Sequence, residues 1–320
     1  MTTALPRSTP EAQGIPSAAI GAFERALEKL DRVDSYLVVR AGQVIAERWW
    51  APAAADIPHV MWSISKSFTS TAVGLAISEG LFGLHDRVVD LLPESAPANI
   101  SQRLARLTVR HLLTMTTGHA SESLPEPERE DEVDWAGHVL AHPLEFEPGT
   151  RFVYNSGASY LLSAIVQSTS GRGLVDYLTP RLFAPLDIAP PAWLLSPQGI
   201  AAGGWGLSLR TEDLAKFGEL YLHGGRLGDA QIVPADWVRE ATSWQVSNGD
   251  PTAPSDWSQG YGYQFWQCRH GAFRGDGLGG QLCVAMPEQD AVVVITADLT
   301  DMQREIDVVW DHLLPALPRV

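Results

Sequence analysis

The 320-residue chain has few cysteines and no long hydrophobic run, and each shortage excludes a class of protein. Its only cysteines, Cys268 and Cys283, cannot build a disulfide framework or a four-cysteine zinc site, and we expect both to be reduced and buried. No stretch approaches the ~18 consecutive apolar residues that a membrane-spanning helix needs. The first residues lack the basic-then-apolar order of a secretory signal, so we expect a cytoplasmic protein.

Positive charge is also scarce. Lys and Arg number 23 against 38 Asp and Glu, which gives a formal net charge of −15. Because such a surface repels phosphate backbones and anionic lipid, we expect neither a nucleic-acid nor a membrane partner. The composition, 45% hydrophobic and 19% charged, is typical of a globular protein.

Lysine is the rarest charged residue. It occurs only at Lys29, Lys66 and Lys216, so the other 20 of the 23 basic residues are arginine. Arginine therefore carries the ordinary surface charge. A lysine within an apolar segment, such as Lys66, indicates proton chemistry, because a buried lysine can lose its proton near neutrality and arginine cannot.

Hydrophobic periodicity predicts helices at both ends of the chain and through its middle, with strands near both ends. The acidic segment 122–132 is predicted to be an exposed loop, and Thr211 is predicted to be a helix N-cap. The predicted helices are 16–30, 63–79, 107–115, 134–140, 159–169, 211–223 and 302–314, and the predicted strands are 35–40, 43–50, 260–266, 281–286 and 291–297.

This order predicts an α+β fold in which both ends of the chain build one sheet and the terminal helices cover one of its faces. Residues 1–60 and 200–320 would form the sheet domain, and residues 61–199 a mostly helical domain.

The residues with the clearest chemistry are Ser63 and Lys66. Their spacing of three, at the start of a helix, puts both side chains on one face. The N-terminal end of a helix offers free backbone N–H groups and a positive dipole, which favour developing negative charge. A serine hydroxyl becomes a good nucleophile only when a base takes its proton, and a partly buried lysine can be that base.

Two further segments suit the same chemistry. Tyr154, followed by Asn155 and Ser156, lies in a turn before a helix and could direct its hydroxyl into a cleft. The glycine-rich run Gly277-Leu278-Gly279-Gly280-Gln281 precedes a strand. Its glycines would let backbone N–H groups approach a ligand closely, as an oxyanion hole requires.

Together and in this order, the three segments resemble those of the serine β-lactamase and penicillin-binding-protein superfamily, over nearly the full chain. The class C-like branch, with its esterases, D-aminopeptidases and 6-aminohexanoate-dimer hydrolases, is the most similar. The resemblance implies an antiparallel sheet flanked by terminal helices, with an active site in the seam to the helical domain. It implies Ser63 as nucleophile, Lys66 as base and Tyr154 as proton relay. Backbone N–H groups of Ser63 and of Leu278 or Gly279 would form the oxyanion hole.

Two departures from that family bear on the substrate. Class C β-lactamases have Tyr-x-Asn where this chain has Ser156 in the third position, so either Asn155 or Ser156 contacts substrate. No lysine lies near the strand that carries Lys-Thr-Gly in β-lactamases, and Lys216-Phe217-Gly218 falls within a predicted helix. Both departures argue against a true β-lactamase.

The eleven tryptophans suggest an aromatic pocket for an apolar acyl or aryl group. We expect Trp62, Trp205, Trp266 and Gln281 to bind substrate. The sequence thus predicts a serine hydrolase that cleaves a small carboxylic ester or amide with no metal or organic cofactor. The alternatives are β-lactamase or D-amino-acid peptidase activity, and a non-catalytic binding protein on the same scaffold. Neither the natural substrate nor the oligomeric state is predicted.

Overall fold

Strands from both ends of the chain pair into one six-stranded antiparallel sheet. The computed structural model describes residues 4–124 and 134–320, and every statement below concerns those residues. The strand order confirms the predicted fold class, since the first two strands lie beside the last one. Across the sheet it runs β2 (Gln43–Trp49), β1 (Val33–Arg40), β10 (Ala291–Ala297), β9 (Gln281–Met286), β8 (Phe273–Gly277) and β7 (Trp266–Gln267).

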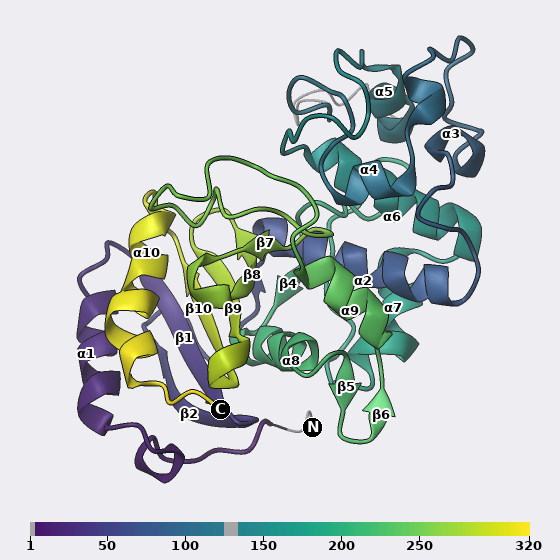
Figure 1. The fold of residues 1–320 in the computed structure, drawn as a ribbon. Coiled ribbons are helices and arrows are strands. Elements are labelled where there is room, and N and C mark those ends of the chain that lie inside the picture. Colours follow the sequence, from purple (N-terminus) through teal and green to yellow (C-terminus); the bar gives the residue numbers. More distant parts are fainter. Residues whose placement is uncertain (1–3, 125–133) are drawn as a thin grey trace.

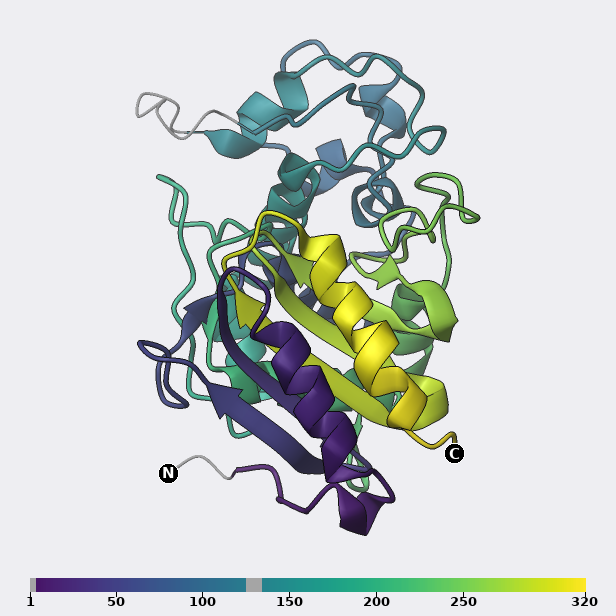
Figure 2. The same cartoon turned by 90° about the vertical axis from the view of Figure 1, so that its left-hand side faces the viewer.

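Alternate residues of the central strands face opposite sides of the sheet, and both faces are covered. Val38 and Val293 pack on one side, against α1 (Ser17–Leu27) and α10 (Met302–Val308) with its continuation to Leu313. Figures 1 and 2 show these two terminal helices running together across that face.

The other face of the sheet packs against two helices from the middle of the chain. Leu37 and Val292 share a core with α8 (Thr211–Leu222) and α2 (Ser65–Ser78). Of the remaining helices, α9 lies beside α2, and α3, α4 and α5 are the farthest from the sheet in Figure 1. These remaining helices are α3 (Val88–Leu91), α4 (Val109–Leu113), α5 (Trp135–Ala141), α6 (Ser156–Ser170), α7 (Leu174–Leu178) and α9 (Ala235–Thr242). The division into two domains stays a prediction.

Helix α2 is buried along most of its length, as its apolar circumference predicts. Several of its polar side chains donate to nearby carbonyls: the Thr71 hydroxyl, for example, donates to the carbonyl of Ser67 at 2.8 Å. Phe68 stacks on Phe217 of α8 with ring centroids 3.9 Å apart. Gly74 admits the Trp237 ring of α9, which would lie 2.3 Å from an added Cβ. Helix α2 is therefore held on several sides at once.

Two local predictions are wrong, and a third concerns residues that the structure mostly does not describe. The strand predicted at 260–266 is reduced to Trp266–Gln267, because positive φ angles at Gly260 (110°) and Gln264 (64°) break the extended backbone. The N-cap of α8 is Arg210, and Thr211 instead shares a hydroxyl hydrogen bond of 2.7 Å with Ser35 of β1. Most of the predicted loop 122–132 lies outside the described residues.

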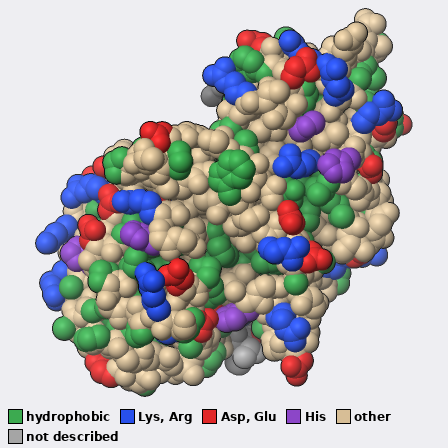
Figure 3. Space-filling model, in the orientation of Figure 1, with side chains coloured by type: hydrophobic (Ala, Val, Ile, Leu, Met, Phe, Trp, Pro, Cys, Tyr) green, Lys and Arg blue, Asp and Glu red, His purple; other side chains and the backbone are tan. Residues whose placement is uncertain are grey.

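Two further observations concern the apolarity of the helices and the distribution of charge on the surface. In the described parts of the chain, no helix combines the length and the apolarity needed to cross a bilayer. Basic and acidic side chains are interspersed over the face of the molecule that Figure 3 draws.

Replacing the stacked phenylalanine at the centre of this core tests the packing between α2 and α8. Phe217→Ala should lower the free energy of unfolding by about 3–5 kcal/mol, because the cavity left between Phe68 and Phe265 cannot close. Urea denaturation of both proteins measures this. Leu81→Ala, at a side chain on the surface, is the control and should cost less than about 1 kcal/mol. Equal losses in the two variants would contradict this description of the core.

Candidate active site

Ser63 lies in the single helical turn η2 (Trp62–Ile64) that leads directly into α2. The turn is fixed from behind, where the backbone N–H of Met61 donates to the carbonyl of Leu207 at 2.8 Å. Trp62 has a φ of 46°, a left-handed conformation that is costly for a bulky residue. The local strain and the half-buried hydroxyl of Ser63 together indicate a functional turn.

The amine of Lys66 reaches Ser63, as the spacing predicts. Its Nζ donates to Ser63 Oγ at 3.0 Å, to Ser156 Oγ at 3.1 Å and to the carbonyl of Gly204 at 2.9 Å. The side chain is 1% exposed. Burial lowers the pKa of Lys66 to about 7, although the charge of Glu122 opposes this by raising it. A substantial share of neutral amine is therefore present near neutral pH.

Tyr154 completes a cluster of four side chains, which we call the Ser63 cluster: Ser63, Lys66, Tyr154 and Ser156. Its phenol hydrogen-bonds to Ser63, and its ring centroid lies 4.8 Å from the Lys66 amine. Trp266 stacks behind this ring at 5.3 Å. Burial raises the pKa of the Tyr154 phenol above its ordinary value, so it keeps its proton at neutral pH and can donate it.

The glycine-rich run forms the tight hairpin between β8 and β9. Gly277 pairs with Gln281, and positive φ angles at Gly279 (82°) and Gly280 (92°) turn the chain. A Cβ added at Gly277 would lie 2.4 Å from the carbonyl oxygen of Met61, so only glycine lets the hairpin come this close to the Ser63 turn. Gly277, the residue before Leu278, is thereby brought against Met61, two residues before Ser63.

Gln281, which we expected to bind substrate, has its side chain inside the protein. It is 4% exposed, and its amide donates to the carbonyls of Ala297 (2.6 Å) and Leu278 (3.4 Å). The residue ties the hairpin to β10. It supports the turn from within and does not face a ligand.

Asn155 and Ser156 differ in their contacts. Asn155 is fully buried and caps α6, its Oδ1 accepting from Gly157 N at 2.8 Å while its Nδ2 contacts His119. Ser156 directs its hydroxyl to Lys66. Of the two, Ser156 belongs to the cluster, and Asn155 holds the helix that presents it.

The three tryptophans differ in how they meet the site. Trp62, 41% exposed, adjoins Ser63 and is open to a ligand. Trp205 follows Gly204, whose carbonyl binds Lys66, and stacks on Trp135 with centroids 6.0 Å apart. Trp266 is buried behind Tyr154 and supports that ring instead of lining the opening.

One charged side chain of the site was not found from the sequence. The carboxylate of Glu122 accepts from the backbone N–H groups of Ser156 (2.7 Å) and Gly157 (3.0 Å) at the start of α6. Glu122 lies 34 residues before that helix in an acidic run, and no local pattern separates it from its neighbours. The sequence does carry a signal for the backbone that approaches Lys66, namely the two consecutive glycines Gly203 and Gly204.

No lysine replaces that of Lys-Thr-Gly on the strand beside the site. Lys216 lies in α8, as predicted, and donates to the carbonyl of Asp187. Arg274 of β8 is fully buried and paired with Asp276 at 2.9 Å, with its guanidinium 5.4 Å from the Trp266 ring centroid. Neither cation is placed to receive a substrate carboxylate.

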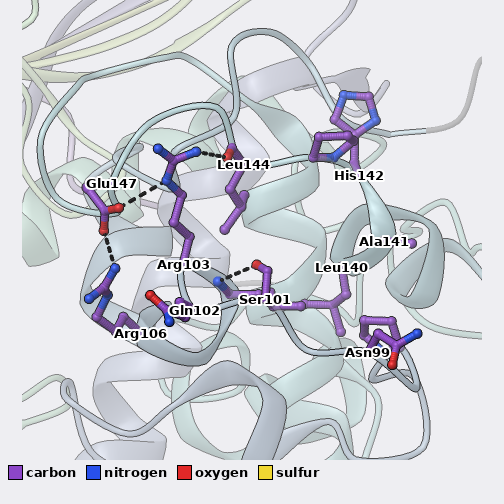
Figure 4. Close-up of a pocket in the computed structure, with 13 residues that line it drawn as sticks. Asn99, Ser101, Gln102, Arg103, Arg106, Leu140, Ala141, His142, Leu144 and Glu147 are labelled. Atoms are coloured by element: carbon purple, nitrogen blue, oxygen red, sulfur yellow. Dashed lines mark hydrogen bonds and ion pairs between the residues drawn. The ribbon is translucent and has the colours of Figure 1, made fainter.

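A separate hollow of about 570 Å³ lies in the helical part, between the end of α5 and the segment around Arg103 (Figure 4). Arg103 and Arg106 line it, but both are paired with Glu147, at 3.0 Å and 2.7 Å. The members of the Ser63 cluster are absent from its lining. The hollow is therefore distinct from the candidate active site.

Comparison with known proteins agrees with this geometry. The family model described as Beta-lactamase matches residues 8–314. The chain belongs to the beta-lactamase family. Among curated members it is 27% identical to the 6-aminohexanoate-dimer hydrolase of Paenarthrobacter ureafaciens, over 92% of this chain and 81% of that protein.

Solved structures share the beta-lactamase-family fold. A penicillin-binding-protein homologue from Caulobacter crescentus superposes with a TM-score of 0.71 at 17% identity, covering 93% of this chain and 97% of that one. EstCE1, described as a hydrolase with promiscuous acyltransferase activity, gives 0.71 at 19% identity over 91% and 96%. Membership of the beta-lactamase family, together with the contact between Ser63 and Lys66, makes the protein a serine hydrolase.

A substitution that adds one methyl group tests the close approach of the β8–β9 hairpin to the turn that carries Ser63. Gly277→Ala should lower kcat/KM for an ester at least about tenfold, because the new Cβ would push the hairpin away from the Met61 carbonyl. Circular dichroism should show a folded protein. Gly83→Ala, at a half-buried glycine where the nearest atom would lie 3.8 Å from the added Cβ, is the matched control. Full activity in Gly277→Ala would rule out an oxyanion hole at this hairpin.

Proposed function

We propose that this enzyme cleaves a small carboxylic ester or amide through an acyl-enzyme formed on Ser63. The observation that carries the proposal is the 3.0 Å contact between Ser63 Oγ and the buried amine of Lys66. In its neutral form the amine can donate two N–H groups to Ser156 and Gly204. Its lone pair is then free to accept the proton of Ser63.

The reaction follows from these contacts. Lys66 takes the hydroxyl proton while Ser63 Oγ attacks the carbonyl carbon of the substrate. Backbone N–H groups of Ser63 and of Leu278 or Gly279 stabilise the oxyanion. As the tetrahedral intermediate collapses, Tyr154 donates a proton to the departing alcohol or amine and recovers one from Lys66. Water then attacks the acyl-enzyme, releasing the carboxylic acid and returning a proton to Ser63.

An ester is the better substrate on chemical grounds, because an alkoxide or phenoxide needs less help to depart than an amide nitrogen, which must be protonated before it can leave. The exposed Trp62 suits an apolar acyl or aryl group. Similarity to a 6-aminohexanoate-dimer hydrolase keeps amides within the proposal. Similarity to an Escherichia coli β-lactamase, 24% identical over 62% of this chain, makes β-lactams the second candidate, although no substituting lysine meets the hairpin.

We further propose a cytoplasmic location. The two cysteines support it, since Cys268 and Cys283 are both free and buried, as is usual where thiols stay reduced. Cell fractionation tests the proposal.

Removal of the proposed nucleophile is the decisive test. Ser63→Ala should reduce hydrolysis of p-nitrophenyl butyrate by at least about a thousandfold and abolish labelling by a fluorophosphonate. Ser70→Ala, on the same helix with a buried hydroxyl that has no hydrogen-bond partner, is the control and should retain activity. Equal turnover by Ser63→Ala would refute the assignment. Nitrocefin assayed in parallel separates the β-lactamase alternative.

The buried amine also sets a pH dependence. Because Lys66 must be neutral to act as a base and burial lowers its pKa to about 7, kcat/KM should fall about tenfold per pH unit below that value. Stopped-flow assays from about pH 5 to 9 measure this limb. Lys66→Arg keeps the charge but cannot lose its proton, so it should be inactive throughout. A flat wild-type profile over this range would mean that another group is the base.

A further inference from the structure

Glu122 is held at the start of α6 by a set of backbone hydrogen bonds. Its Oε2 accepts from Ser156 N at 2.7 Å, and its Oε1 accepts from Gly157 N at 3.0 Å. Oε1 also accepts from the N–H groups of Ser123 (2.9 Å) and Leu124 (3.2 Å). Four donors therefore fix this carboxylate, although the residue itself is exposed to solvent.

The fixed carboxylate is two hydrogen bonds away from the amine of Lys66. Ser156 joins them, because its backbone N–H donates to Glu122 while its hydroxyl accepts from Lys66 Nζ at 3.1 Å. A shift of the Glu122 side chain would therefore displace the residue that orients the amine. The contact belongs to α6, a helix of fifteen residues, and fixes its first turn.

The charges around Lys66 leave Glu122 with a distinct electrostatic role. Every hydrogen-bond acceptor of the amine is a neutral oxygen, and the phenol of Tyr154 packs on it without a charge. Among the residues that the structure describes, Glu122 is the carboxylate that acts on Lys66, raising its pKa against the effect of burial. The charge of Glu122 also acts on the buried His119, whose imidazole burial keeps neutral. The positive end of α6 would otherwise disfavour a charged amine.

We propose that Glu122 is a positioning residue of this enzyme, which holds Ser156 against the Lys66 amine and places a fixed negative charge two hydrogen bonds away from it. The proposal rests on the role proposed for Lys66. It assigns a function to a side chain that does not itself touch the reacting atoms.

Loss of the negative charge of Glu122 should change the pH dependence of the reaction, whereas loss of a cap at the start of α6 should not. In Glu122→Gln an amide oxygen remains as acceptor, but the negative charge is gone. The amine then loses its proton more easily, so the acidic limb of kcat/KM should move down by roughly 0.5–1 pH unit. About one unit below the wild-type midpoint, the variant should keep several times more of its maximal activity than the wild type does. A purely structural cap predicts a lower plateau with the midpoint unchanged.

The experiment compares pH profiles of p-nitrophenyl butyrate hydrolysis and of fluorophosphonate labelling for the full chain and two variants. Glu94→Gln, at an exposed glutamate of the same helical part, is the control and should keep the wild-type midpoint. A lower midpoint in Glu122→Gln alone supports the proposal. An unchanged or higher midpoint overturns it, as does an equal shift in Glu94→Gln.

A second variant covers the case in which Glu122→Gln does not fold. Glu122→Asp keeps the charge on a shorter side chain, so it should lower the plateau through Ser156 and leave the midpoint near the wild-type value. A midpoint that falls in Glu122→Asp would overturn the electrostatic role. Failure of the proposed function is recognised separately, because Ser63→Ala would then be as active as the wild type whatever the Glu122 variants do.

Discussion

The site depends on an amine that the fold removes from water. Lys66 stands in the first turn of α2, two residues before Phe68, and the same helix that fills the core carries the amine into it. Three neutral oxygens surround Nζ, so hydrogen bonds are satisfied while no bonded carboxylate fixes the proton. Desolvation then dominates and lowers the pKa of Lys66 to about 7. Packing and catalysis are thus two consequences of burying one helix.

Close backbone approaches bring distant segments around that amine. The hairpin after Gly277 abuts the Met61 carbonyl, and Gly203 passes so near α6 that an added Cβ would lie 2.6 Å from the carbonyl oxygen of Ser159. Gly204, directly after it, gives Lys66 its carbonyl contact. Glycine is required where a Cβ would meet backbone, because backbone atoms of a packed core cannot move aside. Four segments far apart in the chain therefore meet around the turn that carries Ser63 and Lys66.

Local sequence patterns predicted the parts of the fold and site that depend on neighbouring residues. The spacing of Ser63 and Lys66 is a property of one helical turn, and the apolar runs of β9 and β10 are each a property of one strand. Contacts between residues that are far apart in the sequence could not be predicted from such local patterns. Gln281 has a polar side chain that turned inward to the carbonyl of Ala297, and Glu122 reaches a helix 34 residues later. Both contacts depend on the path that a loop takes between distant parts of the chain, and local sequence does not set that path.

The scarcity of lysine offers a direct measurement of the central claim. Because the chain holds only three lysines, protein labelled with ¹³C at lysine Cε gives three resonances, which Lys29→Arg and Lys216→Arg variants assign. The account predicts that the Lys66 resonance titrates with a midpoint of about 7 in the folded protein. A Lys66 resonance that keeps its ammonium position up to about pH 9 would contradict the account, because the amine could not then act as a base at neutral pH.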